Sequence, residues 1–283
     1  MKVAVIGSSG GMGRFFAEYF LSQGHEVTGS DIREARTSDP RFTTVRSNRD
    51  AVRRAEVVLV ATPIDSTVQT VREIAPALRK GAHVIEIASL KGKITGRLKP
   101  ALRERGARLL SLHPLFGPSI SSSKNMKLCV VDAGAEELEF AKRLFPGAIL
   151  IPIKEKEHDR AMAVILSLTH LLNIAYAATV AKHVTPKEFR KMESPTSAVQ
   201  LSLAEGVLNQ SAVLYSYIQL ENELSAQLAD ELIEYLTQLR AIIVKKDRKA
   251  FERLFSELSE IYADDSKTAL ESIYEAFEVK QSR

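Results

Sequence analysis

The start of the chain restricts its fold more than any other segment. Residues 2–6 form a short apolar run, glycines follow at positions 7, 10 and 13, and a helical pattern begins at Met12. A strand, a GxxGxxG turn and a helix in this order predict the first unit of a parallel βαβ sheet. The chain is therefore expected to begin with an α/β domain that binds a dinucleotide.

The glycine spacing has a chemical reason. Gly7 permits a tight turn, Gly10 lets the backbone approach a pyrophosphate, and Gly13 lets the helix lie close to the strand. Asp31 ends the next expected strand, where a carboxylate accepts hydrogen bonds from ribose hydroxyls and repels a 2′-phosphate. We therefore expect NAD, although Arg33 leaves NADP open and Asp31 could be a solvated turn residue. The residues expected to contact the cofactor are Gly7, Ser9, Gly10, Gly11, Met12, Gly13, Asp31, Thr62 and Pro63.

The pattern changes along the chain from alternating strands and helices to helices alone. Strands are expected at 2–6, 26–30, 57–61, 83–87, 108–111, 128–132 and 149–153, with helices at 12–23, 66–80 and 136–145. This alternation predicts a Rossmann-type, mainly parallel sheet in residues 1–153. Residues 154–283 are expected to form an all-α domain with helices near 155–182, 186–206, 210–246 and 248–279. Its apolar faces suit a homodimer or a monomer core.

Composition excludes several classes of function. The 283 residues carry a formal charge of only +4, contain no Trp, and have no Cys/His spacing typical of a metal site. We therefore expect neither nucleic-acid binding nor a metal. The uncharged segment 161–181 is interrupted by polar residues, which favours a buried helix over a membrane span. The single cysteine, Cys129, and the absence of a signal-peptide pattern lead us to expect a cytoplasmic protein.

Two further strand ends carry polar side chains. Ser89 and His113 both follow expected strands, at the sheet edge where the glycine turn also lies. Histidine is the usual proton acceptor near neutral pH, and Ser89 could hold a substrate hydroxyl or orient the imidazole. His113 could equally be a structural histidine. Thr62 and Pro63 follow another strand and either line the cofactor site or form a simple turn.

The run from His113 to Pro118, HPLFGP, resembles the HPMFGP signature of the prephenate dehydrogenase family, which includes arogenate and cyclohexadienyl dehydrogenases. The resemblance covers nearly the whole chain. Its motifs are the glycine turn, Ser89-Leu90-Lys91, Glu157-His158-Asp159-Arg160, residues 167–170 and Ser194-Pro195.

This resemblance implies NAD-dependent oxidative decarboxylation of prephenate to 4-hydroxyphenylpyruvate in tyrosine biosynthesis, or the same reaction on arogenate. His113 would take the proton of the ring hydroxyl, and Ser89 would help to hold that hydroxyl and the imidazole. His170 would lie near the substrate's side-chain carboxylates, and is otherwise a buried helix histidine. His158 is expected to brace the first helix of the second domain without being catalytic. A homodimer is implied, with fusion to chorismate mutase or prephenate dehydratase modules open.

One position departs from the family. An arginine usually follows the Ser-Pro pair, but Ala198 stands there. The dicarboxylate needs another cation, and the candidates are Lys124, Lys91, Arg190 and Lys191. Two other functions stay open: a different reductase on the same plan, such as a pyrroline-5-carboxylate or deazaflavin-dependent NADP reductase, and a non-catalytic dinucleotide sensor. Asp31 counts against an NADP enzyme, and neither reductase explains the His113-Pro114 signature.

Overall fold

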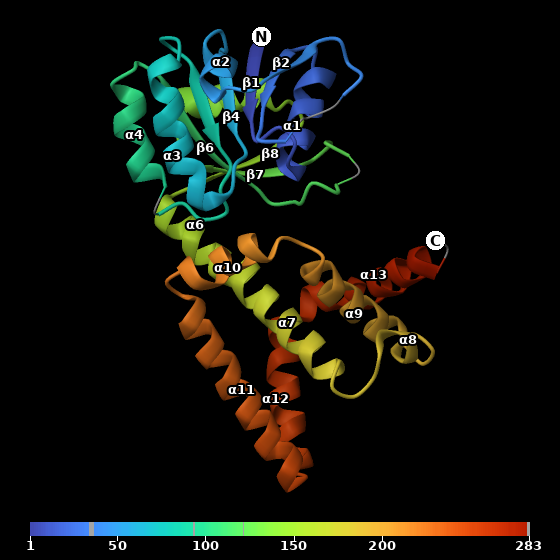
Figure 1. Cartoon of the computed structure of the whole chain (residues 1–283). Helices are drawn as coiled ribbons and strands as arrows, with labels where there is room; N and C mark the ends of the chain where they lie inside the picture. Colours follow the sequence, from blue (N-terminus) through green and yellow to red (C-terminus); the bar gives the residue numbers. More distant parts are fainter. Residues whose placement is uncertain (34–36, 93, 121, 282–283) are drawn as a thin grey trace. The chain divides into compact units, whose positions relative to one another are not determined.

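The computed structural model describes residues 1–33, 37–92, 94–120 and 122–281. It contains two compact units, Met1–Met162 and Ala163–Arg283 (Figure 1). The expected boundary after residue 153 coincides with the end of the last strand, whereas the first unit also includes helix α6 (Glu155–Met162). This difference has a physical cause, because His158 and Asp159 of α6 hydrogen-bond to side chains and backbone of the first unit.

The first unit is built on one sheet. Its order in the described residues is β3-β2-β1-β4-β5-β6-β7-β8, and every pairing is parallel except that of β6 with β7. The strands are β1 (Lys2–Ile6), β2 (Glu26–Ser30), β3 (Phe42–Val45), β4 (Val57–Val60), β5 (His83–Glu86), β6 (Arg108–Pro114), β7 (Lys127–Val131) and β8 (Ile149–Ile153). The expected mainly parallel sheet is confirmed. Only β3 has no counterpart in the sequence prediction, because this short edge strand exposes Thr43 and Thr44 and lacks an apolar run.

Helices cover both faces of the sheet (Figure 1). Alternate residues of β1 point to opposite faces, so Val3 and Val5 join one core cluster while Ala4 and Ile6 join another. The first cluster includes residues of α1 (Gly11–Ser22) and α5 (Ala135–Leu144), and the second includes residues of α2 (Asn48–Val52), α3 (Ile64–Ile74) and α4 (Thr95–Arg103). Large buried side chains such as Phe16 each contribute about 1.5–3 kcal/mol.

The sheet direction determines where a site can form. β1, β2, β4, β5 and β6 are mutually parallel, so their carboxyl ends lie at one edge. Ligands of such sheets bind at this edge. The fold therefore brings the glycine turn, Asp31, Thr62, Ser89 and His113 to the same side of the first unit.

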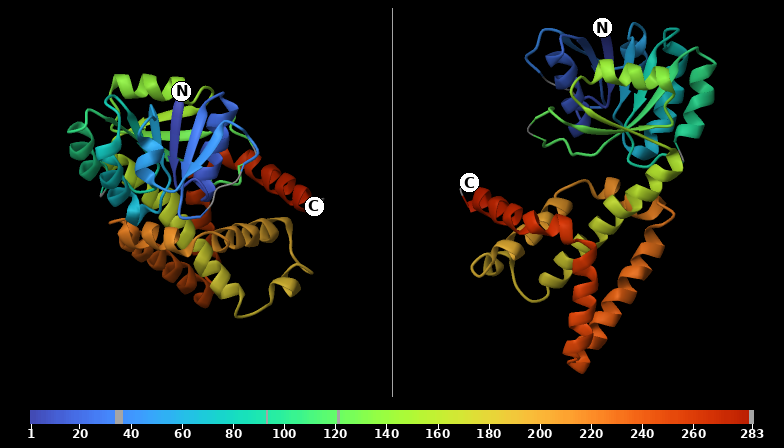
Figure 2. Two further views of the ribbon diagram at one scale, coloured as in Figure 1. Left: turned by 45° about the horizontal axis from the view of Figure 1, so that its top comes forward. Right: turned by 180° about the vertical axis from the view of Figure 1, so that it is seen from behind.

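The second unit is helical in its described residues. A π-helical segment (Ala163–Leu168) precedes α7 (Thr169–Val180), α8 (Pro186–Phe189), α9 (Pro195–Leu208), α10 (Ala212–Glu221), α11 (Ser225–Lys245), α12 (Arg248–Ile261) and α13 (Ala263–Gln281). Figure 2 shows α11 and α12 side by side as a pair of long helices. Three of the long expected helices are each divided in two.

The divisions have local causes. Ser194 caps α9 by accepting a hydrogen bond from the backbone N–H of Ser197, and Pro195 follows at the first turn. The Asn222 side chain accepts from the backbone N–H of Leu224 and separates α10 from α11. Asp247 caps α12 as its place between the expected helices suggests. Among the described residues, only Glu155–Val180 is long and apolar enough to span a membrane, and core helices of soluble proteins meet the same two criteria.

Candidate active site

The glycine turn after β1 allows no side chain at two of its positions. Gly7 has a left-handed conformation with φ of +85°, and a Cβ there would lie 2.6 Å from the carbonyl oxygen of Ala61. A Cβ on Gly13 would overlap the carbonyl oxygen of Gly7. The first turn of α1 therefore lies directly against the end of β1, which explains the spacing of these glycines.

The N-terminus of α1 offers donors for an anion. Gly10 is its N-cap residue, and no described side chain caps the helix. An uncapped N-terminus presents backbone N–H groups and a partial positive charge. A Cβ on Gly10 would meet only the carbonyl oxygen of Gly7, at 3.4 Å, so no other atom crowds this position. Gly11 has a different role, because a Cβ there would lie 2.8 Å from the side chain of Pro118.

Asp31 lies beside the turn at the end of β2. Its Oδ2 accepts a hydrogen bond from the backbone N–H of Ser9 at 3.0 Å, and its Oδ1 accepts one from that of Arg33 at 3.0 Å. Burial opposes ionisation, but the bonds from Arg33 and Ser9 outweigh it and lower the pKa of Asp31. A carboxylate at this position suits ribose hydroxyls. The turn, the helix N-terminus and Asp31 together fit NAD.

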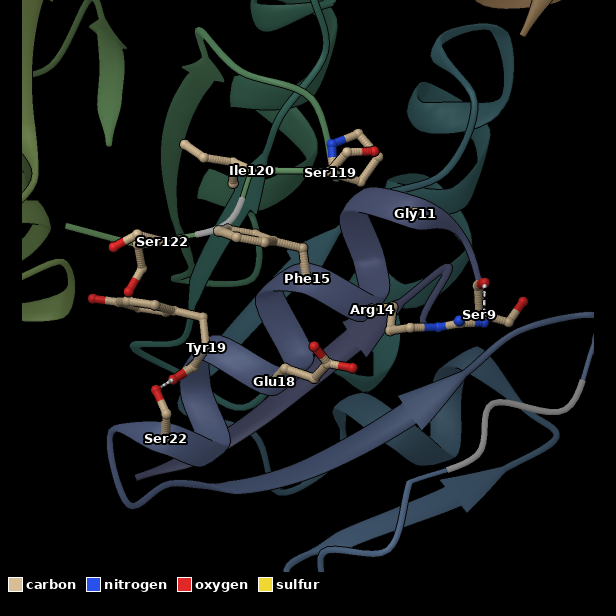
Figure 3. Close-up of a pocket in the computed structure, with 12 residues that line it drawn as sticks. Ser9, Gly11, Arg14, Phe15, Glu18, Tyr19, Ser22, Ser119, Ile120 and Ser122 are labelled. Carbon is tan, nitrogen blue, oxygen red and sulfur yellow. Dashed lines mark hydrogen bonds between the residues drawn. The ribbon is translucent and has the colours of Figure 1, made fainter. Parts of the chain in front are cut away.

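A cleft of about 550 Å³ extends from the turn along α1 (Figure 3). Arg14, Phe15 and Tyr19 of α1 line it together with Pro118 and Ile120 of the loop after β6. The Arg14 guanidinium donates to the carbonyl oxygen of Ser9 at 3.5 Å. A cation therefore lies next to the turn, in a position that suits a phosphate.

The segment that begins with His113 connects β6 to the start of α1. His113 pairs in register with Cys129 of β7 and is 4% exposed. Three residues later, the ring of Phe116 packs edge-on against that of Phe15, with 5.2 Å between centroids. Pro118 then lies over Gly11. This segment fixes His113 at the sheet edge that carries the glycine turn.

Two residues of α6 form a hydrogen-bonded chain with His113. Nδ1 of His113 lies 2.9 Å from Nε2 of His158, whose Nδ1 lies 2.8 Å from Oδ1 of Asp159. His158 is fully buried. The Asp159 carboxylate also accepts hydrogen bonds from the backbone N–H groups of Lys91 at 3.0 Å and Gly92 at 2.8 Å. The carboxylate is thus held by the loop after β5.

A buried ion pair of Lys91 and Glu86 lies next to the strand that carries His113. Nζ of Lys91 donates to Oε1 of Glu86 at 2.7 Å and to the carbonyl oxygen of Leu112 at 2.6 Å. The hydroxyl of Ser111 also donates to Glu86. Both charged side chains have zero exposure. The hypothesis that Lys91 binds the carboxylates of a substrate is therefore wrong, because its ammonium group is enclosed within the first unit.

These surroundings keep His113 neutral. Burial, then the positive charge of Lys91, and then His158 lower the pKa of His113 well below its ordinary value of 6.5. Nδ1 is occupied by His158, while Nε2 has no hydrogen-bond partner among the described residues. A neutral imidazole with one available ring nitrogen can accept a proton.

His170 lies in the second unit, in α7. Its ring packs against that of Tyr215, with 4.2 Å between centroids, and burial lowers the pKa of His170. Its Nδ1 is buried and has no hydrogen-bond partner within the described part of the chain. This nitrogen could bond to a ligand.

Two family models match the chain. Residues 16–133 match the nucleotide-binding domain of prephenate dehydrogenase, and residues 154–257 match its dimerization domain. The chain belongs to the prephenate/arogenate dehydrogenase family. These two matches confirm the resemblance inferred from the His113 segment and the other motifs.

Two curated relatives cover most of this chain. A probable arogenate/prephenate dehydrogenase of Methanocaldococcus jannaschii is 27% identical over 278 residues, 94% of this chain and 62% of that protein. A 4-amino-4-deoxyprephenate dehydrogenase of Streptomyces pristinaespiralis is 26% identical over 271 residues, 91% of this chain and 90% of that protein. The chain thus spans about three fifths of the first relative and most of the second.

Solved structures of the family share the fold. Prephenate dehydrogenase from Aquifex aeolicus, in complex with hydroxyphenyl propionate and NAD+, has a TM-score of 0.73 and 20% identity, covering 94% of this chain and 98% of that one. Synechocystis arogenate dehydrogenase has a TM-score of 0.69 and 17% identity, covering 94% and 100%. The architecture is therefore that of prephenate/arogenate dehydrogenases.

Ser89, Thr62 and Pro63 lie beyond the carboxyl ends of β4 and β5. Ser89 follows β5, is partly buried, and forms no side-chain hydrogen bond among the described residues. His158, rather than Ser89, therefore holds the imidazole of His113. Pro63 is the N-cap residue of α3, and the Thr62 hydroxyl lies 3.4 Å from that of Thr67, so these two residues form the turn into α3 at the cofactor edge.

The cation positions differ in their environment. Ala198 is fully buried in α9 and supplies no charge. Arg190 pairs with Glu205, and Lys191 is exposed. Lys124 is exposed in the loop between β6 and β7.

Sequence reasoning missed three parts of this site. The contact of His158 with His113 joins residues far apart in the chain, and its only signal was the Glu157-His158-Asp159-Arg160 motif. Glu86 gave no signal, because an acidic residue at a strand end usually faces solvent. Arg14 has no distinguishing sequence signal, because the sequence contains many lysines and arginines in helical segments.

Proposed function

We propose that this protein catalyses the NAD-dependent oxidative decarboxylation of prephenate to 4-hydroxyphenylpyruvate. The observation that carries the proposal is the state of His113, a buried and neutral imidazole held through Nδ1 at the cofactor edge of the sheet. Family membership supports the same reaction class. The names of the two curated relatives add arogenate and 4-amino-4-deoxyprephenate as related substrates.

Each part of the first unit has a role in this reaction. The N–H groups at the start of α1, with Arg14, would hold the pyrophosphate, and Asp31 would hold the adenosine ribose. NAD, when bound, supplies a nicotinamide ring that accepts the hydride from C4 of the substrate ring. Nε2 of His113 takes the proton of the C4 hydroxyl. The C–C bond to the ring carboxylate then breaks and CO2 leaves. Its bonding electrons make the ring aromatic, and the C4 oxygen takes the proton back from the imidazolium of His113 to become the hydroxyl of the product.

Other residues would bind the substrate. Ser89, which no described side chain engages, is free to hydrogen-bond the ring hydroxyl. His170 and Lys124 are the candidates for the substrate's side chain, and the unpartnered Nδ1 of His170 supports the first of them. Prephenate and arogenate differ only in a keto against an amino group on that side chain.

The second unit supports assembly as a homodimer. It matches a dimerization domain and exposes large apolar side chains on its last three helices. Examples are Ile243, Val244, Phe255 and Ile261, which are 66%, 66%, 64% and 72% exposed. An exposed apolar surface of this kind typically marks an interface. We propose a cytoplasmic homodimer.

The test is the absorbance of reduced nicotinamide with purified protein, NAD or NADP, and prephenate, arogenate or 4-amino-4-deoxyprephenate in parallel. We expect turnover with NAD and prephenate. His113→Asn should lower turnover by about 10²-fold or more while NAD still binds. Turnover only with another substrate would keep the mechanism and change the substrate. An unchanged rate in His113→Asn would remove the histidine from the reaction, and binding of NAD without any turnover would favour a sensor.

A further inference from the structure

Two hydrogen bonds link the buried ring of His113 through His158 to Asp159 of α6, and they can determine the protonation pattern of that ring as well as its position. We propose that His158 and Asp159 are positioning residues that fix which ring nitrogen of His113 accepts the substrate's proton. The inference rests on the proposed function for its substrate, but its structural part concerns the protonation pattern of His113 and can be measured without one.

Asp159 determines which atoms donate and which accept in this series of hydrogen bonds. A carboxylate accepts hydrogen bonds and donates none when ionised. Burial opposes its ionisation, but hydrogen bonds from His158 and from the backbone N–H groups of Gly92 and Lys91 lower the pKa of Asp159. Nδ1 of His158, 2.8 Å from Oδ1, must therefore carry the proton of that bond.

The proton on Nδ1 of His158 in turn determines the protonation pattern of His113. In a neutral imidazole one nitrogen donates and the other accepts, so Nε2 of His158 is an acceptor. Nδ1 of His113, 2.9 Å away, must donate to it. Nε2 of His113 is left with its lone pair and without a partner among the described residues. The inferred tautomer of His113 is thus the one that can take a proton at Nε2.

The same chain stabilises the product of the proton transfer. When the substrate's O–H bond breaks and an N–H bond forms at Nε2, His113 becomes an imidazolium. Its Nδ1–H bond to His158 becomes charge-assisted, and such bonds are roughly twice as strong as neutral ones. The negative charge of Asp159, at the other end of this series of hydrogen bonds, stabilises the new positive charge on His113.

A purely structural role for α6 predicts something different. If the three side chains only joined α6 to the sheet, any replacement that keeps the hydrogen bonds would keep the activity. Asp159→Asn separates the two cases. An amide oxygen at the Oδ2 position can still accept from Gly92, while the amide nitrogen faces Nδ1 of His158. The bond from residue 159 to His158 and the bond between the two rings would both be reversed, which moves the proton of His113 to Nε2.

The decisive measurement is ¹⁵N NMR of histidine-labelled protein at neutral pH. His113→Asn and His158→Gln identify the two rings among the 6 histidines. We expect His113 to carry its proton on Nδ1 in the native protein and on Nε2 in Asp159→Asn. A native His113 protonated on Nε2 would overturn the proposal. This result does not depend on turnover, so failure of the proposed function would be recognised separately.

Kinetics provide the second test. Asp159→Asn should lower kcat by about 10²- to 10⁴-fold, as expected for a base in the wrong tautomer, with little change in NAD affinity. Glu157→Gln is the matched control, because it removes a carboxylate from the exposed face of the same helix. The control should keep the native rate. A native rate in Asp159→Asn would contradict the positioning role.

A pair of variants at His158 covers the case in which Asp159→Asn does not fold. The amide oxygen of glutamine can reach the place of Nε2 and accept from Nδ1 of His113, whereas leucine cannot. His158→Gln should therefore keep the Nδ1–H form of His113 and a rate at least tenfold above that of His158→Leu, a difference of about 1.4 kcal/mol. Equal rates in the two variants would overturn the proposal.

Discussion

The ammonium nitrogen of Lys91 lies 2.7 Å from a carboxylate oxygen of Glu86, and neither side chain is exposed. The same nitrogen donates to the carbonyl oxygen of Leu112, next to His113 in the chain. The pair therefore places a positive charge near the imidazole, where it helps to keep His113 neutral. A charged pair inside an apolar sheet is costly, and it is more readily explained by this effect on the site than by stability.

Lys91→Met should destabilise the protein strongly. The substitution leaves Glu86 buried without its partner, and breaking such a pair costs about 3–5 kcal/mol. Lys142→Met is the control, because the pair of Lys142 with Glu139 is exposed and should contribute no more than about 1 kcal/mol. Urea unfolding followed by circular dichroism measures both. The double variant Lys91→Met/Glu86→Gln should recover part of the loss, and an equal loss in the control would contradict the argument.

Features that depend on neighbouring residues in the sequence could be predicted, whereas features that depend on contacts between distant residues could not. β1 and the glycine turn were predicted because an apolar run and the glycines at 7 and 13 are local signals. β3 and the breaks at Ser194 and Asn222 depend on edge pairing and capping, which periodicity does not report. The contact between His113 and His158 depends on how α6 packs on the sheet, and no local pattern contains it.

Activity should persist below the ordinary pKa of histidine. The pKa of His113 is lowered by burial first, then by Lys91 and His158, so the neutral base survives as the pH falls through 6.5. Glu86, Cys129 and Asp159 are the other titratable groups around it. The acidic limb of kcat/KM should have its midpoint below pH 6.5, measured with saturating NAD. A midpoint at or above 6.5 would contradict this electrostatic account.

The same shift has a consequence for stability. The unfolded chain binds the proton of His113 near pH 6.5, whereas the folded protein binds it only at lower pH. The free energy of unfolding should therefore fall as the pH is lowered below 6.5. His113→Asn should make this slope shallower, as measured by urea unfolding at a series of pH values. An unchanged slope would show that other groups produce it.

Gly13→Ala should disrupt the cofactor site. The new Cβ would overlap the carbonyl oxygen of Gly7, so the start of α1 must move away from β1. Gly206→Ala in α9 is the matched control, because its Cβ would meet nothing within 4 Å, and alanine should stabilise that helix by about 0.5–1 kcal/mol. Calorimetric titration with NAD should detect no binding to Gly13→Ala and native binding to the control. Native affinity in Gly13→Ala would show that the close approach of helix and strand is not required.

Asp31 should control the choice between NAD and NADP. Its carboxylate is anchored by the backbone N–H groups of Ser9 and Arg33, and the low pKa keeps it charged, so a 2′-phosphate at this position would be repelled. Asp31→Asn keeps an acceptor for the backbone and removes the charge. We expect the ratio of kcat/KM for NADP over NAD to rise at least tenfold, equivalent to about 1.4 kcal/mol. Asp65→Asn, which removes an exposed carboxylate at the start of α3, should leave the ratio unchanged. If Asp31→Asn also leaves it unchanged, the discrimination must come from residues other than this carboxylate, and Arg14 in the adjoining cleft would be the next to substitute.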